Sequence, residues 1–257
     1  MIRGMDTSAS ALIALGREQE TLARSATNVS TPGFLALWPE REAAPQQALR
    51  GVSVQGNATL VSLAAAGALA TGVRLVGTAL DLAPCPLVPA PAGLDLAVAP
   101  LEGAFLAVRQ PDGTTAYTRD GGFLRAPNGT LIAPDGAQLL GVNGQPLVVP
   151  QGPLQVRSDG SLWGADGRAV GQLLLMLPQD GQRLVPVGNA RFLDPAVTMR
   201  QVAGGRVAPG FLMGSNVSLD GLLIQELEAQ QRYNANVALL QLQDQGMQQL
   251  LGEIRLA

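Results

Sequence analysis

Residues 218–254 read SLDGLLIQELEAQQRYNANVALLQLQDQGMQQLLGEI, and this stretch decides the class of fold. It contains no proline. Residues seven apart form two rows, in which the polar members are Glu226, Gln230 and Asp244; the apolar members are Leu219, Tyr233, Leu240, Met247 and Ile254 in one row and Leu223, Val237 and Leu251 in the other. The spacing predicts a single amphipathic helix roughly 50 Å long. Such a helix needs a partner along most of its length.

A second helix is predicted from about Thr7 to Asn28, with Asp6, Thr7 or Ser8 as its N-cap. Its seven-residue rows are Met5, Leu12, Gln19 and Ala26, and Ser8, Leu15, Leu22 and Val29. Pro32 and Gly33 then end the helix, because proline lacks an N–H donor and glycine permits a turn. The two helices can pair within one chain or with other subunits, and their polar heptad positions favour a larger bundle.

The middle of the chain has the rhythm of antiparallel strands joined by hairpins, from Leu94 to about Val207. The turn signals are Pro111-Asp112-Gly113, Pro127-Asn128-Gly129, Pro134-Asp135-Gly136, Asn143-Gly144, Ser158-Asp159-Gly160, Ala165-Asp166-Gly167 and Gln179-Asp180-Gly181. The predicted strands include Phe105–Arg109, Thr115–Thr118, Thr130–Ala133, Leu147–Val149, Leu154–Val156 and Leu173–Leu177. Calcium repeats also use Asp-Gly pairs at tight spacing, but here the pairs are scattered one per turn and hairpin chemistry explains them.

These patterns predict an α+β fold, in which long N- and C-terminal helices form a coiled-coil-like core layer and the central domain is mainly antiparallel β. The predicted domains are an N-terminal helical segment at 1–34, an extended or irregular linker at 35–92, a β domain at 93–208 and a C-terminal helical segment at 209–257.

The composition argues against most site chemistry. All 17 basic residues are arginine, histidine is absent and Cys85 is the single cysteine. A Ser-His-Asp triad, an imidazole metal site and an intrachain disulfide are therefore excluded. No basic run suggests nucleic-acid binding. We predict no catalytic, cofactor-binding or metal-binding residues, no cofactor and no small-molecule substrate.

A glycosidase is an alternative, because such enzymes use a pair of carboxyl groups. Two pairs are possible here, Asp112 with Asp120 and Asp159 with Asp166. Sugar clefts usually present aromatic side chains, whereas Trp38 and Trp163 are isolated in this sequence. The expectation is therefore that the chain is not an enzyme.

Five short segments match motifs that occur together in one known protein family. Asn28, Thr31, Pro32, Gly33 and Phe34 match Asn-x-x-Thr-Pro-Gly-Phe, although Ser25, Ala26 and Thr27 depart from the residues before it. Ser215, Asn216 and Val217 match Ser-Asn-Val, with Met213 in place of an acidic residue; Ala229-Gln230-Gln231-Arg232-Tyr233-Asn234-Ala235-Asn236 follows. Leu94-Asp95-Leu96-Ala97 and Ala116-Tyr117-Thr118-Arg119-Asp120-Gly121-Gly122-Phe123 complete the set. With these motifs the chain resembles the rod-and-hook family of the bacterial flagellum.

The resemblance implies a structural subunit that polymerises with itself and with other rod proteins into the shaft linking motor and hook. It places the terminal helices in the innermost layer of a tube, with an assembly interface made of Leu12, Leu15, Leu22, Leu219, Leu223, Tyr233, Val237, Leu240, Met247 and Leu251. The family motif residues Asn28, Thr31, Pro32, Gly33, Phe34, Ser215, Asn216 and Val217 then have turn roles.

The resemblance also implies a location and a route. The N-terminus lacks the features of a secretory signal, and the family is exported by the flagellar type III apparatus without a cleaved signal. The expected location is the basal-body rod, where it crosses the periplasm. Thr-Pro-Gly-Phe-Leu and the lack of an early Trp favour a proximal-rod over a distal-rod subunit. The other alternative is an exported β-domain adhesin or binding module.

Overall fold

A computed structural model describes residues 2–55, 58–70, 72–90, 94–98, 103–179, 184–196, 198–202 and 206–256. The chain divides into two compact units. Unit 1 comprises Met1–Ala23, Trp38–Ala79 and Asp220–Ala257, and unit 2 comprises Arg24–Leu37 and Leu80–Leu219. The fold is α+β with a mainly antiparallel β domain, as the sequence predicted.

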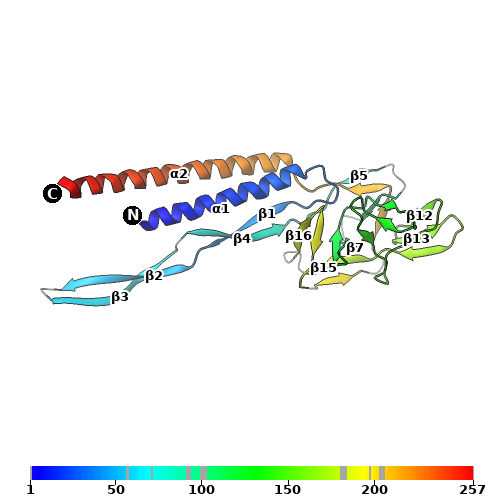
Figure 1. Cartoon of the computed structure of the whole chain (residues 1–257), viewed down its shortest axis with the longest axis horizontal. Coiled ribbons are helices and arrows are strands. Elements are labelled where there is room, and N and C mark those ends of the chain that lie inside the picture. The colour runs from blue at the N-terminus through cyan, green and yellow to red at the C-terminus, as the bar shows by residue number, and fades with distance from the viewer. Residues whose placement is uncertain are drawn as a thin grey trace. The chain divides into compact units, whose positions relative to one another are not determined.

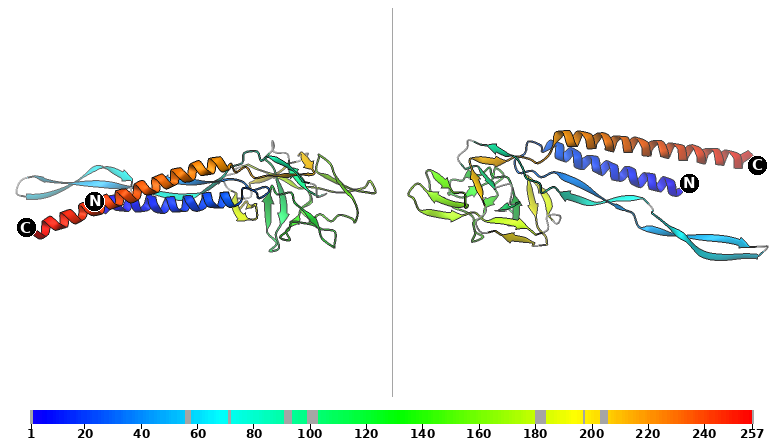
Figure 2. Two further views of the ribbon diagram at one scale, coloured as in Figure 1. Left: turned by 90° about the horizontal axis from the view of Figure 1, so that it is seen from above. Right: turned by 180° about the vertical axis from the view of Figure 1, so that it is seen from behind.

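Two helices supply the helical part of the described chain, α1 (Ile2–Thr27) and α2 (Leu219–Leu256). They lie side by side and run in opposite directions in unit 1 (Figures 1 and 2). Gln19 Nε2 donates to Glu226 Oε1 at 3.5 Å, and Gly4 lies against the side chain of Gln243, which fixes this antiparallel register. Neither helix combines the length and the apolar character that a membrane span requires, among the residues described.

The ends of α1 differ in how well the sequence predicted them. The helix begins at Ile2, so Asp6, Thr7 and Ser8 lie inside it and the predicted N-cap is wrong. No proline precedes Asp6, and a single glycine, Gly4, does not break a helix. The helical hydrogen bonds therefore continue toward the N-terminus. The C-terminal end is close to the prediction, because Asn28 Nδ2 and Thr27 Oγ1 both donate to the carbonyl of Arg24.

Long strands occupy most of the segment for which the sequence predicted an extended or irregular linker. β1 (Leu37–Ala43) neighbours β4 (Val73–Leu80), and β2 (Gln46–Gln55) pairs antiparallel with β3 (Ala58–Ala70). β1 and β4 flank α1 on the side opposite α2 (Figure 2). The main-chain pairing of these strands does not depend on an alternating apolar pattern, which this segment lacks.

Unit 2 is built on a nine-stranded sheet whose main order is β16-β17-β8-β7-β11-β10-β9, with β15 paired to β7 and β18. Its strands are β7 (Phe105–Arg109), β8 (Thr115–Thr118), β9 (Leu124–Arg125), β10 (Leu131–Ile132), β11 (Gln138–Leu139), β15 (Leu175–Pro178), β16 (Val185–Gly188), β17 (Arg191–Leu193) and β18 (Met199–Gln201). A three-stranded sheet adds β12 (Leu154–Val156), β13 (Ser161–Gly164) and β14 (Ala169–Gln172).

Two further strand pairs complete unit 2. β6 (Leu96–Val98) pairs with β19 (Val207–Pro209), and β5 (Leu87–Pro89) pairs with β20 (Phe211–Met213). Both pairs are antiparallel. They join segments more than a hundred residues apart, so the residues that flank α2 in the sequence are tied to the residues that precede the β domain.

The predicted turns are hairpin turns of one chemical type. In six of them the Asp or Asn side chain accepts a hydrogen bond from the backbone N–H two residues later, as Asp112 does from Thr114 at 2.8 Å. The glycine that follows has a positive φ, +88° at Gly136 for example. The seventh signal, at 179–181, lies partly outside the described residues.

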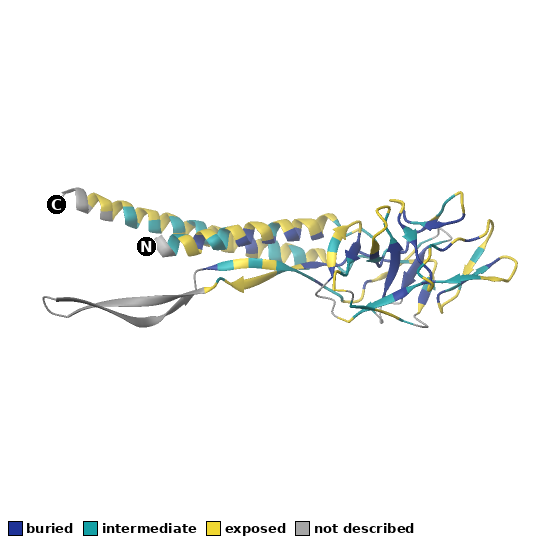
Figure 3. Ribbon diagram, turned by 60° about the horizontal axis from the view of Figure 1, so that its bottom comes forward, coloured by how far each residue is buried: buried dark blue, intermediate teal, exposed yellow. Residues whose placement is uncertain are grey.

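Most of the predicted strands are present. β7, β8 and β12 have the predicted bounds. β10 lies within its predicted range, and β15 overlaps its predicted range. Residues 147–149 do not form a named strand, although Val148 makes an isolated bridge with Thr130. Buried apolar side chains of unit 2 are continuous along β6 and along most of β7, and Figure 3 shows the buried residues in dark blue inside the β domain.

Candidate functional site

The segments that carry the motifs at 28–34, 94–98, 116–123 and 213–217 meet in unit 2. They come from the loop after α1, from β6, from the loop after β8 and from the segment between β20 and α2. We call this meeting point the motif junction. Its contacts are mainly made by backbone groups, so its role is structural.

Gly33 is the closest point of contact in the motif junction. Its N–H donates to the carbonyl of Met213 at 2.7 Å, which links the loop after α1 to β20. Its φ is +68°, and a Cβ at this position would lie 2.2 Å from the backbone nitrogen of Asp120. Only glycine satisfies both conditions, since other residues rarely adopt this φ and a backbone atom cannot move aside cheaply.

Asn216 holds three backbone segments together with one amide. Its Oδ1 accepts from the N–H of Ala36 at 2.7 Å, and its Nδ2 donates to the carbonyl of Asp81 at 2.9 Å. Ser215 Oγ accepts from the N–H of Val217 at 3.2 Å, which shapes the approach to α2. Asn216 therefore connects the residues before α2 to the loop after α1, a role that a purely local turn residue would not have.

The other two motif segments pack backbone against backbone. The N–H of Leu96 donates to the carbonyl of Gly121 at 3.1 Å, and Asp95 forms a bridge with Gly122. A Cβ on Gly121 would lie 1.5 Å from the carbonyl oxygen of Leu96. Asp120 Oδ1 accepts from Gly122, and burial raises the pKa of Asp120 above its usual value, although hydrogen bonding to Gly122 opposes the rise.

Arg119 is the charged centre of unit 2 and is only 1% exposed. Its guanidinium donates to the carbonyls of Gly103 and Ala83 and lies 4.7 Å from the centroid of the Phe105 ring. Burial lowers the pKa of Arg119, and nearby Cys85 opposes this change. Burial likewise raises the pKa of the Cys85 thiol, so this cysteine is a packed group, as its buried position also shows.

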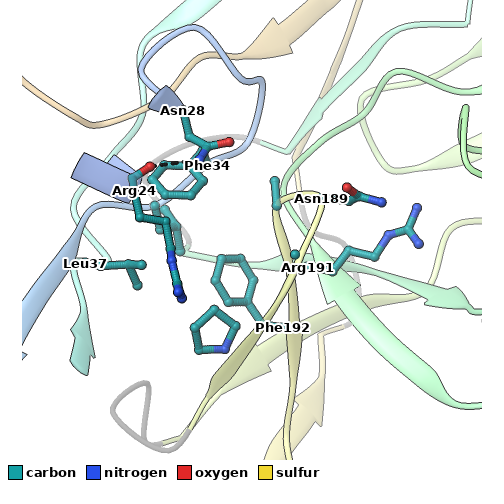
Figure 4. Close-up of a pocket in the computed structure, with 11 residues that line it drawn as sticks. Arg24, Asn28, Phe34, Leu37, Asn189, Arg191 and Phe192 are labelled. Atoms are coloured by element: carbon teal, nitrogen blue, oxygen red, sulfur yellow. Dashed lines mark hydrogen bonds between the residues drawn. The ribbon is translucent and has the colours of Figure 1, made fainter. Parts of the chain in front are cut away.

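A cavity of about 200 Å³ lies beside the motif junction, between the end of α1 and the β16–β17 hairpin (Figure 4). Phe34, Leu37 and Phe192 form much of its wall, and the Arg24 side chain extends between Leu37 and Phe192. Asn28 and Asn189 stand at its sides. Its lining is largely apolar, with no carboxylate, so it offers no acid–base pair.

The hairpin that bounds this cavity is anchored by Asp135. Arg191 pairs with Asp135 Oδ1, and Asn189 Nδ2 donates to Oδ2 at 3.0 Å. Burial alone would raise the pKa of Asp135, but the hydrogen bonds from Arg191, Asn189 and the Ala137 N–H outweigh burial and hold the pKa below its usual value. Asn189 and Ala190 both have a φ of +50°, so this anchor maintains a turn that non-glycine residues disfavour.

The predicted interface residues on the helices separate into two groups. Leu15 and Leu22 are buried in unit 1, and Leu12, Val237, Leu240 and Met247 are half-buried. Leu219, Leu223, Tyr233 and Leu251 are exposed. The row Ser8, Leu15 and Leu22 is therefore buried. The second buried set on α1 is Glu18 and Ser25, which lie one residue before Gln19 and Ala26 of the other predicted row. On α2, Ala229 is fully buried where the prediction had Gln230.

Large apolar side chains of α2 are exposed in this chain, on more than one side of the helix. Leu223 is 63% exposed and Leu227 is 64% exposed. The set, which we call the α2 apolar face, consists of Leu219, Leu223, Ile224, Leu227, Leu239, Leu242 and Leu251. An exposed apolar surface of this extent is typical of an interaction surface.

The carboxylates considered for catalysis serve the turns. Asp112, Asp159 and Asp166 each accept from the backbone two residues later. Hydrogen bonds from Thr114 lower the pKa of Asp112, and those from Ser161 lower the pKa of Asp159. Within the described part of the chain, no group of His, Cys, Asp and Glu side chains could hold a metal ion.

Two family models match the chain. The model described as "Flagellar hook protein FlgE/F/G D1 domain" matches residues 102–187, and "Flagellar basal body rod FlgEFG protein C-terminal" matches residues 208–253. A flagellar basal-body rod protein FlgF from Mesorhizobium japonicum is 30% identical over 81% of this chain and 80% of its own length. The chain belongs to the flagellar basal-body rod protein family.

Other members of the rod family match over different shares of the chain. The rod protein FlgG of Borreliella burgdorferi is 26% identical over 95% of this chain and 96% of its own length, and FlgG of Bacillus subtilis is 28% identical over 62% and 64%. Rod proteins are structural proteins, not enzymes, and the resemblance drawn from the motifs is confirmed. The D1 match covers β7 to β16, and the C-terminal match covers β19, β20 and most of α2.

One cluster in unit 1 escaped sequence reasoning. The carboxylate of Glu18 on α1 forms ion pairs with Arg41 on β1 and with Arg232 on α2, although the three residues are far apart in the chain. Glu18 follows Arg17 on a helix with an amphipathic pattern, and such a pattern favours solvent exposure of charged side chains. Only the packing of three elements around this position shows that the carboxylate is buried.

Proposed function

We propose that the chain is a structural subunit of the proximal part of the flagellar basal-body rod, polymerising with itself and with other rod proteins into the shaft that transmits torque. The α2 apolar face carries this proposal, because large exposed apolar side chains on several sides of a 38-residue helix require cover from other subunits. In the assembled rod, α1 and α2 would enter a coiled-coil-like core layer.

The motif junction supports the same function. Open helical assembly requires different patches of one subunit to meet repeatedly in the same geometry. Gly33 and Asn216 make the backbone path of the loops that precede and follow the β domain specific. The predicted interface residues Leu219, Leu223, Tyr233 and Leu251 are then available for contacts between subunits.

The place within the rod and the route to it are finer parts of this proposal. Distal-rod members of the family typically carry Thr-Asn-Gly-Phe-Lys, whereas this chain has Thr31-Pro32-Gly33-Phe34-Leu35, which favours the proximal over the distal rod. Export would use the flagellar type III apparatus without removal of a signal peptide, and the rod would then cross the periplasm. Mass spectrometry of purified basal bodies tests the route, since an uncleaved N-terminus is expected.

Deletion of the gene, followed by electron microscopy of isolated basal bodies, tests the function. We expect loss of swimming, with membrane rings present and no rod beyond them, because a proximal subunit comes before the rest of the shaft. A short rod stub would instead favour a distal subunit. Normal flagella with a lost adhesive trait would overturn the rod assignment and support the adhesin alternative.

A further inference from the structure

A second cavity, of about 170 Å³, lies in unit 1 where α1, α2, β1 and β4 approach one another. Its wall includes the small side chains of Ala11 and Ala14 from α1 and the charged side chains of Glu18, Arg41 and Arg232. We call it the Glu18 cleft. Large side chains at Ala11 or Ala14 would fill it, so the small residues keep it open.

The Glu18 side chain is only 7% exposed, and its two oxygens are used unequally. Oε1 pairs with Arg41 and lies 3.9 Å from Arg232 Nη1. Oε2 is buried and has no hydrogen-bond partner. A buried carboxylate oxygen without a donor has lost the free energy of hydration, and no hydrogen bond compensates for this loss. A donor group bound in the cleft would remove this cost.

The charges around the cleft restrict what this occupant can be. A cationic group would approach the guanidinium groups of Arg41 and Arg232, and an anionic group would approach the unpartnered Oε2. A neutral donor avoids both repulsions. The amide of Gln or Asn fits best, because its NH₂ can donate to Oε2 while its carbonyl accepts from a guanidinium.

Such amides are abundant on the surface of α2. Its exposed glutamines include Gln230, Gln231, Gln241 and Gln245, interleaved with the leucines of the α2 apolar face. A second copy of this chain could therefore cover apolar surface and insert an amide with one helix. We propose that the Glu18 cleft receives a glutamine or asparagine side chain from α2 of a neighbouring copy of this chain.

This proposal rests on the proposed function in one respect, since it takes self-assembly as given. It adds to it the place of contact, the chemistry of the inserted group and the identity of the partner element. The Glu18 cleft would then determine the register between neighbouring subunits, because a neutral donor must reach one particular carboxylate oxygen.

Filling the cleft tests the proposal with a matched control. Ala11→Leu should occupy it, whereas Ala9→Leu makes the same change at an exposed position of the same helix. We expect Ala11→Leu to weaken self-association of the full-length chain by on the order of tenfold or more, because a buried hydrogen bond to a charged group is lost. Thermal unfolding of the dilute monomer should show that both variants remain folded.

Cross-linking identifies the occupant. A photoreactive benzophenone amino acid at position 11, in a mixture of ¹⁵N-labelled and unlabelled chains, should give mixed-isotope products that contain one of the two tryptic peptides that carry the α2 glutamines, 207–232 or 233–255. Only intrachain products, or products with another segment or another rod protein, would overturn the proposal. So would a wild-type chain that stays monomeric, or an Ala11→Leu variant that associates as the wild type does.

The two levels of proposal can fail separately. If Ala11→Leu associates normally and restores swimming to the deletion strain, the Glu18 cleft is not an assembly contact, yet the rod function stands. If the deletion strain builds normal basal bodies, the rod function itself fails, whatever occupies the cleft.

Discussion

At the scale of single residues, the motif of this chain is a set of backbone constraints. Gly33, Gly121 and Asn216 are needed because backbone groups from distant segments approach them closely. None of the three offers a reactive group. This explains how a strongly patterned motif can belong to a protein whose family is structural.

Gly33→Ala should destabilise unit 2 by about 3 kcal/mol, because it adds both a disfavoured φ and a clash with the Asp120 backbone. Gly113→Ala is the control, since Gly113 also has a positive φ but an added Cβ would meet nothing within 4 Å. Its cost should be about 1 kcal/mol. Chemical denaturation of both variants measures the difference, and equal losses would show that the close approach does not matter.

Asp135 makes the stability of unit 2 depend on acid pH. Its pKa is lower in the folded chain than in the unfolded chain, so its contribution is present above the unfolded pKa and is lost as pH falls through the folded pKa. Asp135→Asn should therefore cost about 1–2 kcal/mol at pH 7 and much less once the pH has fallen below the folded-state pKa of Asp135. Urea unfolding at several pH values checks this, and a cost that is constant with pH would contradict it.

At the scale of elements, parts of the α2 surface have different tasks. One side packs on α1 through residues such as Ala229, and the rest of the surface presents the α2 apolar face. The sequence predicted the helix, but the predicted amphipathic pattern is wrong for α2, because exposed leucines such as Leu223 and Leu239 point in different directions around the helix. Because α1 also contacts β1 and β4, its buried surface is wider than a two-helix heptad pattern allows.

Substitution of the outer leucines should separate folding from assembly. Leu223→Ser with Leu227→Ser should change monomer stability by no more than about 0.5 kcal/mol per site, because both side chains are exposed. The same variant should fail to restore swimming to a deletion strain. Leu22→Ser, at a buried position, should instead cost about 3 kcal/mol in circular-dichroism unfolding. Normal rods built from the double variant would rule out the α2 apolar face as an interface.

At the scale of the whole molecule, the two units differ in how much apolar surface they bury by themselves. In unit 2, Leu96, Val98, Phe105, Leu106 and Val108 are buried almost completely. In the described part of unit 1, α1 contributes Ala14, Leu15 and Leu22 to the core, and α2 contributes Ala229. Unit 1 should therefore depend more on neighbouring subunits for its stability.

Hydrogen exchange on the isolated monomer tests this difference. We expect the amides of α2 to exchange at least about a hundredfold faster than those of β7 and β8, because local opening of a helix with an uncovered apolar face costs less free energy. Assembly into rods should slow exchange in α2 and leave β7 nearly unchanged. Equal protection of α2 and β7 in the monomer would contradict this prediction.

The sequence by itself determined both helices, six hairpin turns, most of the strands tested and the family, because each depends on residues close together in the chain. Helical period, Asp-Gly turns and the Thr-Pro-Gly-Phe motif are local signals. The lack of histidine also excluded imidazole chemistry without any structural information.

Only the tertiary structure decided which helix faces are buried, how residues 37–80 pair and where the motifs meet. A period of 3.6 residues identifies a stripe on a helix but does not say which neighbour covers it. Asn216 and Glu18 depend on partners from separate segments of the chain, so their roles follow from packing. Glu18 is the clearest case, because a charge that a helix pattern would place in solvent is buried by three elements at once.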